Sequence, residues 1–351
     1  MKKYFFSIVF IINFLYTQAA LQTHTEPKET DTTQSENEKK TVNKTFLPQV
    51  YGIIKADFEW NTEEGESRFV VRNARLGLKG DLSPVVNYLM GMDLSDEGSF
   101  KVLSAFADLK PIQKEKHKMF LRLGYQKPLF STEYLRTPMQ IFFARRSMLV
   151  DEMTGGIVDV GLVANYAYAN NILPFDVAVG VFNGMGYKNT PFKTPNYSAR
   201  VRLHPYEGLR LVAQYYGGHN INANPLNTWS VECAYENENL LIEAEYFHRQ
   251  IEFIDSAFVK KNEGILVETY YKFPLKNVGF LHYIAPTARW EMLGSQIFQE
   301  PIQLAGLTMG VNLGVDKSFF KAEIRLNYEK YFKQVISSRQ DMFILEMVIA
   351  I

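Results

Sequence analysis

Residues 319–332 read Phe-Phe-Lys-Ala-Glu-Ile-Arg-Leu-Asn-Tyr-Glu-Lys-Tyr-Phe, and apolar and polar side chains alternate along them. A strand places successive side chains on opposite faces, so this stretch has one apolar and one polar face. The apolar face carries Phe320, Ala322, Ile324, Leu326 and Tyr328. The polar face carries Lys321, Glu323, Arg325, Asn327 and Glu329. Repeated full charges on the polar face favour a water-filled interior, with the apolar face turned toward lipid.

Similar segments of about ten residues follow one another from residue 48 to the end of the chain, separated by turn residues, as in membrane barrels. We count about sixteen, and single-chain bacterial barrels have an even number of strands. Every second connection is short, and the longest connection runs from Lys127 to Thr154. The pattern predicts an all-β fold, a transmembrane antiparallel β-barrel, whose long third extracellular loop either projects from the mouth or folds into the lumen and narrows it. The alternative for this loop is that it lies flat against the wall with its arginines paired.

The N-terminus resembles an export signal. Lys2 and Lys3 precede a short apolar run, and Thr17-Gln18-Ala19 places small residues where a signal peptidase cuts. We therefore predict a cleaved signal peptide over residues 1–19 and localisation to the bacterial outer membrane. Residues 20–47 are rich in Thr, Glu, Lys and Asn and predict a flexible periplasmic segment. The barrel domain is then residues 48–351.

Composition excludes several classes of function. The chain has 38 basic and 38 acidic side chains, and this balance argues against a nucleic-acid partner. Cys233 is the single cysteine, so neither an internal disulfide nor a cysteine-based metal site is expected. The six histidines are scattered, and no sequence motif for a metal, a phosphate loop or a catalytic triad is present. We expect no enzyme activity, no catalytic residues, no metal and no cofactor.

Two stretches resemble the phosphate-selective porin family, the porin O and porin P type. Residues 69–80 read FVVRNARLGLKG and resemble the family's second-strand motif. Residues 123–130 (LGYQKPLF), with Glu133 and residues 142–147 (FFARRS), resemble its fifth strand and the start of its third loop. The resemblance covers most of the chain from residue 48. It implies a homotrimer of sixteen-stranded channels that favours anions, with the third loop folded inward.

The chain departs from the family pattern at three places. Asn73 follows Arg72 where the family often has two arginines, and Arg145-Arg146-Ser147 replaces an acidic residue, arginine and serine. Ile351 ends the chain where such barrels usually end in an aromatic residue. The first two changes alter the charge of the lumen, so phosphate is one of several anions to consider.

The candidate site residues are basic residues that either lie on the inward face of a predicted strand or belong to the third loop. Guanidinium groups in a constricted lumen bind anions through charge-assisted hydrogen bonds. The predicted constriction or anion-binding residues are Arg75, Arg122, Lys127, Arg136, Arg145 and Arg146. The predicted secondary lumen residues are Arg72, Lys79, Arg200, Arg202 and Arg289. The alternative is that these arginines pair with lumen carboxylates and select nothing.

These observations predict an outer-membrane porin, a passive diffusion channel for small hydrophilic solutes that prefers anions. Its expected partners are outer-membrane lipid, small anionic or polar solutes and two further copies of the chain. The alternative is a structural or adhesive barrel with little or no open pore. Single-channel conductance would separate the two.

Overall fold

The computed structural model describes residues 47–351, except 97–98, 171, 185–193, 257, 301, 318–319 and 335–339. The predicted signal peptide (residues 1–19) lies outside the described residues, and so does all but the last residue of the predicted segment 20–47. No helix within the described ranges is long and apolar enough to cross a membrane.

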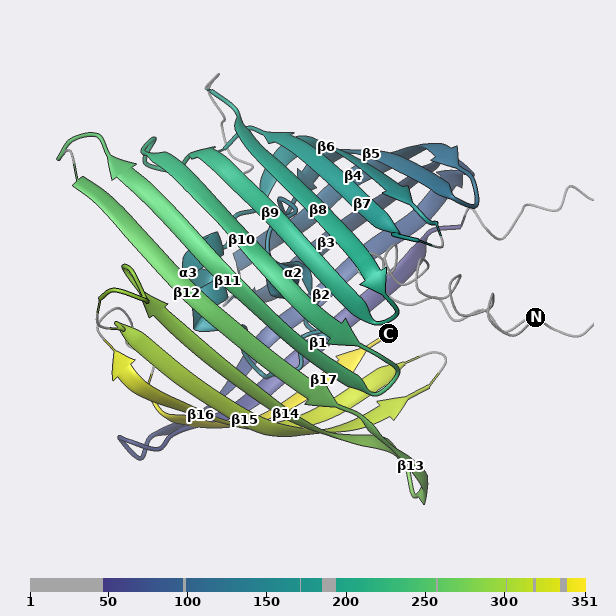
Figure 1. The fold of residues 1–351 in the computed structure, drawn as a ribbon. Helices are drawn as coiled ribbons and strands as arrows, with labels where there is room; N and C mark the ends of the chain where they lie inside the picture. The colour runs from purple at the N-terminus through teal and green to yellow at the C-terminus, as the bar shows by residue number, and fades with distance from the viewer. Residues whose placement is uncertain are drawn as a thin grey trace, which may run out of the picture.

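The described residues form seventeen strands in one antiparallel sheet, and the first strand pairs with the last to close a barrel (Figure 1). The first nine are β1 (Gln49–Asn61), β2 (Ser67–Ser83), β3 (Val86–Asp96), β4 (Ser99–Gln113), β5 (His117–Gln126), β6 (Asp159–Tyr168), β7 (Phe175–Phe182), β8 (Asn196–Tyr206) and β9 (Leu209–His219). The others are β10 (Pro225–Glu236), β11 (Leu240–Phe253), β12 (Phe258–Tyr271), β13 (Phe273–Val278), β14 (Leu281–Gly294), β15 (Leu304–Asp316), β16 (Lys321–Gln334) and β17 (Met342–Ala350).

β12 and β13 are two parts of one barrel position. They follow each other across Lys272, and both pair with β14. The barrel thus has sixteen positions, which confirms the predicted all-β, sixteen-stranded antiparallel barrel.

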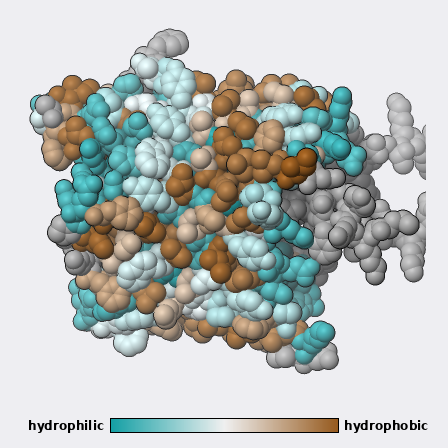
Figure 2. Space-filling model, viewed as in Figure 1, coloured by the Kyte–Doolittle hydropathy of each residue, from teal (hydrophilic) through white to brown (hydrophobic). Residues whose placement is uncertain are grey.

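The two faces of each strand differ as the alternation predicts. Leu123, Val179 and Met309 are exposed on the outside, whereas neighbours such as Arg122 and Ala178 are buried inside the ring. Figure 2 shows apolar side chains spread over the outer face of the strands nearest the viewer. Such a face suits contact with lipid hydrocarbon.

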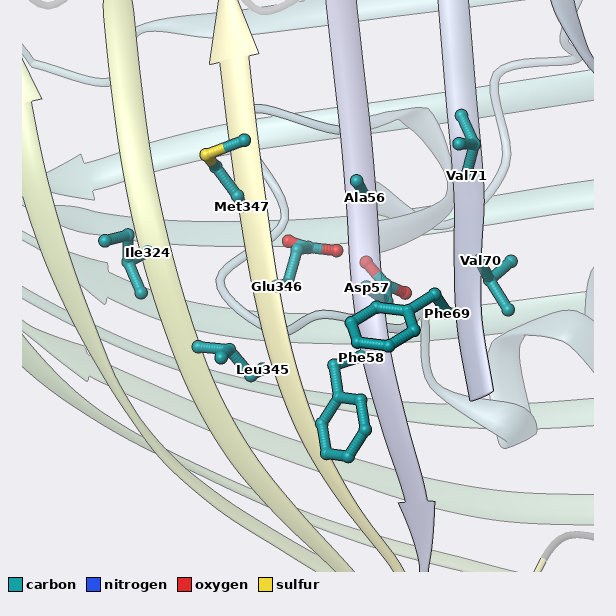
Figure 3. Close-up of a pocket in the computed structure, with 10 residues that line it drawn as sticks. All are labelled: Ala56, Asp57, Phe58, Phe69, Val70, Val71, Ile324, Leu345, Glu346 and Met347. Atoms are coloured by element: carbon teal, nitrogen blue, oxygen red, sulfur yellow. The ribbon is translucent and has the colours of Figure 1, made fainter. Parts of the chain in front are cut away.

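A groove of about 430 Å³ lies on the seam where the first and last strands meet (Figure 3). Its lining comes from β1, β2, β16 and β17, and its apolar side chains include Phe58, Phe69 and Met347, which face away from the lumen. Phe58 and Phe69 pack together with ring centroids 5.1 Å apart. The groove is a feature of the outer surface and not of the channel.

The long connection between β5 and β6 contains two short helices, α2 (Thr132–Leu135) and α3 (Met148–Thr154). We call residues 127–154 loop L3. Ser147 caps α3 by accepting a hydrogen bond from the Val150 amide, and Gly155 ends it in the left-handed conformation (φ 60°). In Figure 1 both helices are seen behind β9–β12, and α3 contacts β11, β12 and β14.

Candidate channel constriction

Loop L3 is attached to the barrel by an apolar core that lies inside the ring of strands. Phe130, Tyr134, Leu149 and Met153 of L3 pack with inward-facing apolar side chains of the wall. Those wall side chains come from β6, β7, β9–β12 and β14–β16 and are Val163, Ala178, Phe182, Tyr216, Leu226, Phe247, Ile251, Leu266, Leu293, Leu304 and Tyr331. Gly264 on β12 makes room for Leu149, because a Cβ at this position would collide with the leucine side chain. Burial of this apolar surface stabilises the loop in place.

Side chains of the wall also form hydrogen bonds with backbone groups of L3. Lys55 Nζ on β1 donates to the Ala144 carbonyl (2.8 Å), and Asn327 Oδ1 on β16 accepts from the Ala144 amide (2.6 Å). The Phe142 carbonyl accepts from Asn312 (2.9 Å), and the Arg145 carbonyl accepts from Arg289 (2.9 Å). Buried backbone groups need such partners, so these four side chains fix the path of the loop across the lumen.

Two charged groups of L3 are covered. Arg136 donates to Glu243 and Glu268, both at 2.8 Å, and its side chain is buried. Glu133 is fully buried and accepts from the Ser147 amide (2.9 Å). Arg136 therefore joins α2 to β11 and β12 and is a structural ion pair.

Arg145 and Arg146 leave the loop in different directions. Arg145 Nη2 lies 2.7 Å from Glu59 on β1, and Arg72 on β2 pairs with the same carboxylate. Arg146 donates to the carbonyls of Glu133 and Arg136 and lies within electrostatic range of Arg75 on β2. L3 therefore brings two guanidinium groups toward β1 and β2.

Lys127 lies at the start of L3. Its ammonium donates to the Tyr134 carbonyl and sits over the Tyr134 ring, 4.1 Å from the centroid. Burial lowers the pKa of the Lys127 ammonium well below its usual range, and the nearby charges of Arg146 and Arg75 lower it further. The arginines around it keep their charge at any working pH.

The remaining predicted residues lie on the wall. Arg122 is buried, pairs with Asp108 (2.6 Å) and stacks on the Phe106 ring at 3.8 Å. Arg200 donates to Thr132 of α2 (2.9 Å), and Arg202 lies 3.8 Å from Asp176. Both are buried, as is Arg289. Lys79 is half-buried on β2. The structure thus brings Arg145 to the carboxylate with which Arg72 pairs, and Arg146 into electrostatic range of Arg75. Arg136 lies in L3, and Arg200 and Arg289 on the wall donate hydrogen bonds to it.

The inward faces on the two sides of the barrel differ in burial. On β11, β14 and β16 the inward residues Glu245, Arg289 and Asn327 are covered by L3 and its neighbours. On β2 and β4 the inward residues Arg75 and Phe106 are only half-buried. Arg75 and Phe106 are thus more accessible to water than the inward residues that L3 covers.

Sequence reasoning did not assign functional roles to Lys55, Asn312 and Asn327, which hold the loop. The alternation along their strands places these three residues on the inward face. This could have indicated their role, because polar side chains that face a lumen can form hydrogen bonds with a loop inside it. Among the residues that the structure describes, no group of three or more His, Cys, Asp or Glu side chains is placed to hold a metal ion.

A closed antiparallel barrel with an apolar outer face and a loop packed across its lumen defines the porin class. The family model of the phosphate-selective porins O and P matches residues 49–215, which confirms the resemblance found in the sequence. Over these residues the chain is similar to that family. The chain is an outer-membrane porin, and family and fold indicate a channel rather than an enzyme.

Solved structures support the fold. An anion-selective porin from Comamonas acidovorans superimposes with a TM-score of 0.60 at 12% identity, covering 87% of this chain and 98% of its own. OmpF of Salmonella typhi, in complex with daunomycin, gives 0.60 at 13% identity, covering 88% and 99%. OprB of Pseudomonas putida gives 0.59 at 12% identity, covering 88% and 94%. A comparison with curated proteins finds no match.

Proposed function

We propose that this porin prefers anions and that solutes pass between loop L3 and the inward faces of β2–β5. Arg75, Arg145 and Arg146 would set the sign of the field there, with Arg72 beside them. Charge at the narrowest part of a pore decides which ions pass, because the low-dielectric wall focuses the field.

The observation that carries this proposal is an asymmetry within the ion pairs. The Arg72 side chain is 33% exposed, but those of its partners Asp57 and Glu59 are 0% and 1% exposed. The same order holds for Arg75 (26%) and Asp93 (8%). It also holds for Arg146 (17%) and Glu133 (0%). A passing ion therefore meets guanidinium groups, while the carboxylates lie behind them, even though the pairs are neutral overall.

The comparisons agree with this proposal. The family is described as phosphate-selective, and the Comamonas acidovorans porin is described as anion-selective. We extend anion preference to this chain and take phosphate as one candidate solute. Arg122 and Arg136, which are covered and paired, are assigned to the support of the wall and the loop.

The reversal potential in a potassium chloride gradient tests this function. For the purified protein in a planar bilayer we expect an open conductance whose reversal potential has the sign of the chloride equilibrium potential. A reversal potential on the potassium side would contradict the proposal. Absence of conductance would favour the alternative of a structural or adhesive barrel.

We also propose that the channel assembles as a homotrimer, as the family resemblance implies. Chemical cross-linking of the protein in its native membrane should give dimers and trimers of the chain. A product restricted to monomers under conditions that cross-link a control trimeric porin would contradict this assembly.

A further inference from the structure

One aromatic side chain of the lumen occupies an unusual place. Tyr51 on β1 lies directly opposite Gly77 on β2, which in turn lies opposite Gly91 on β3. A Cβ on either glycine would collide with the end of the Tyr51 ring. The ring therefore lies across two strands in the space where two side chains would otherwise stand.

Two other tyrosines inside the barrel also lie over a glycine, but both are buried. The ring of Tyr283 lies over Gly314, and that of Tyr331 packs on Gly306. Both tyrosines are 6% exposed. Tyr51 is only half-buried and lies on the side of the lumen that L3 leaves open. Its ring is thus available to a solute, whereas the other two serve packing.

A guanidinium group lies next to this ring. Arg75 precedes Gly77 by two positions on the same face of β2, about 7 Å along the strand, and its charge interacts with the Tyr51 hydroxyl. Arg75 donates through Nε to Asp93 at 3.1 Å. Asp93 also accepts from Asn73 (2.9 Å), the Ala74 amide (3.1 Å) and Ser95 Oγ (2.6 Å). The Asp93 carboxylate therefore accepts several hydrogen bonds from the wall. It orients Arg75 but does not cover the guanidinium group.

We propose that Tyr51 and Arg75 form a subsite for aromatic carboxylates. The carboxylate would pair with the guanidinium group, and the ring of the solute would pack on the open face of Tyr51. A small inorganic anion would use the charge of Arg75 but gain nothing from the aromatic surface. The inference rests on the proposed anion route and names the class of solute that the route favours.

The test compares how strongly benzoate and acetate block the chloride current in a planar bilayer. For the wild-type protein we expect benzoate to block at a concentration about two- to tenfold lower than acetate, the range that an aromatic contact contributes. Tyr51→Ala should abolish this difference, and Tyr51→Phe should keep it. Tyr88→Ala is the matched control, because Tyr88 packs on Gly80 on the outer face, and it should leave the difference unchanged.

The outcomes separate this inference from the proposed function. An anion-side reversal potential with equal block by benzoate and acetate would overturn the subsite and leave the anion channel intact. A cation-side reversal potential would overturn the anion route itself. A difference that survives Tyr51→Ala would also overturn the subsite. Heat-modified mobility on gels reports folding, and Tyr51→Leu, which still covers the glycines with an apolar side chain, replaces the alanine variant if that variant does not fold.

Discussion

Replacing Arg145 and Arg146 together by glutamate is expected to move the reversal potential from the chloride side to the potassium side. Each substitution changes the local charge by two units, so the pair changes it by four. Arg146 lies within range of Arg75, and Arg145 reaches Glu59 on β1, so the change falls where the loop faces the open side of the lumen. A field at this position acts on every ion that passes.

Two further variants distinguish an effect of the local charge on selectivity from an effect of misfolding. Arg145→Gln with Arg146→Gln should shift the reversal potential in the same direction by a smaller amount, because it removes two charges and adds none. Lys261→Glu with Lys276→Glu makes the same four-unit change at exposed positions outside the lumen. It should leave the reversal potential near the wild-type value. Equal shifts in the arginine and the lysine variants would mean that L3 does not set selectivity.

The barrel could be predicted because its signal is local. Alternation along one strand, as in residues 319–332, records which face meets lipid, and no knowledge of a distant segment is needed. The sequence also indicated the number of barrel positions, because the short turns at residues 81–84, 205–208 and 236–239 mark one end of the barrel. No turn in the sequence indicated that one barrel position is divided into β12 and β13.

The interior could be predicted only in part. Phe182, Phe247 and Leu266 face inward although a lumen should be polar, because L3 covers them. Periodicity cannot detect a loop that packs from far along the chain. Arg72 and Asn73 are adjacent in sequence, yet both side chains donate to lumen carboxylates. In a regular strand two adjacent side chains point to opposite faces. A β-bulge opposite Lys55 and Ala56 allows both side chains to reach the lumen.

The exposure of each arginine could not be read from the sequence. Arg75 and Arg136 both have a basic side chain and a carboxylate partner. Arg136 is covered because Glu243 and Glu268 come from strands against which L3 packs, and Arg75 is not, because its partner Asp93 lies on the open side. This difference depends on the path of L3 and decides which residues can select ions.

The most direct test of the account asks where the passage lies. Cys233 is the single cysteine and lies exposed on the outer face, so Cys233→Ala gives a thiol-free channel. In this background we compare Arg75→Cys on the open side with Ser230→Cys on β10. Ser230 is 1% exposed and donates to Glu245 at 2.8 Å. A negatively charged methanethiosulfonate reagent is added to the open channel, where it can attach only to a thiol that water reaches.

The current through the Arg75→Cys channel should fall sharply, because the reagent leaves a bulky negative group in the anion path. The current through the Ser230→Cys channel should stay at its starting value. A loss of current in the Ser230→Cys channel with none in the Arg75→Cys channel would contradict a passage between L3 and β2–β5.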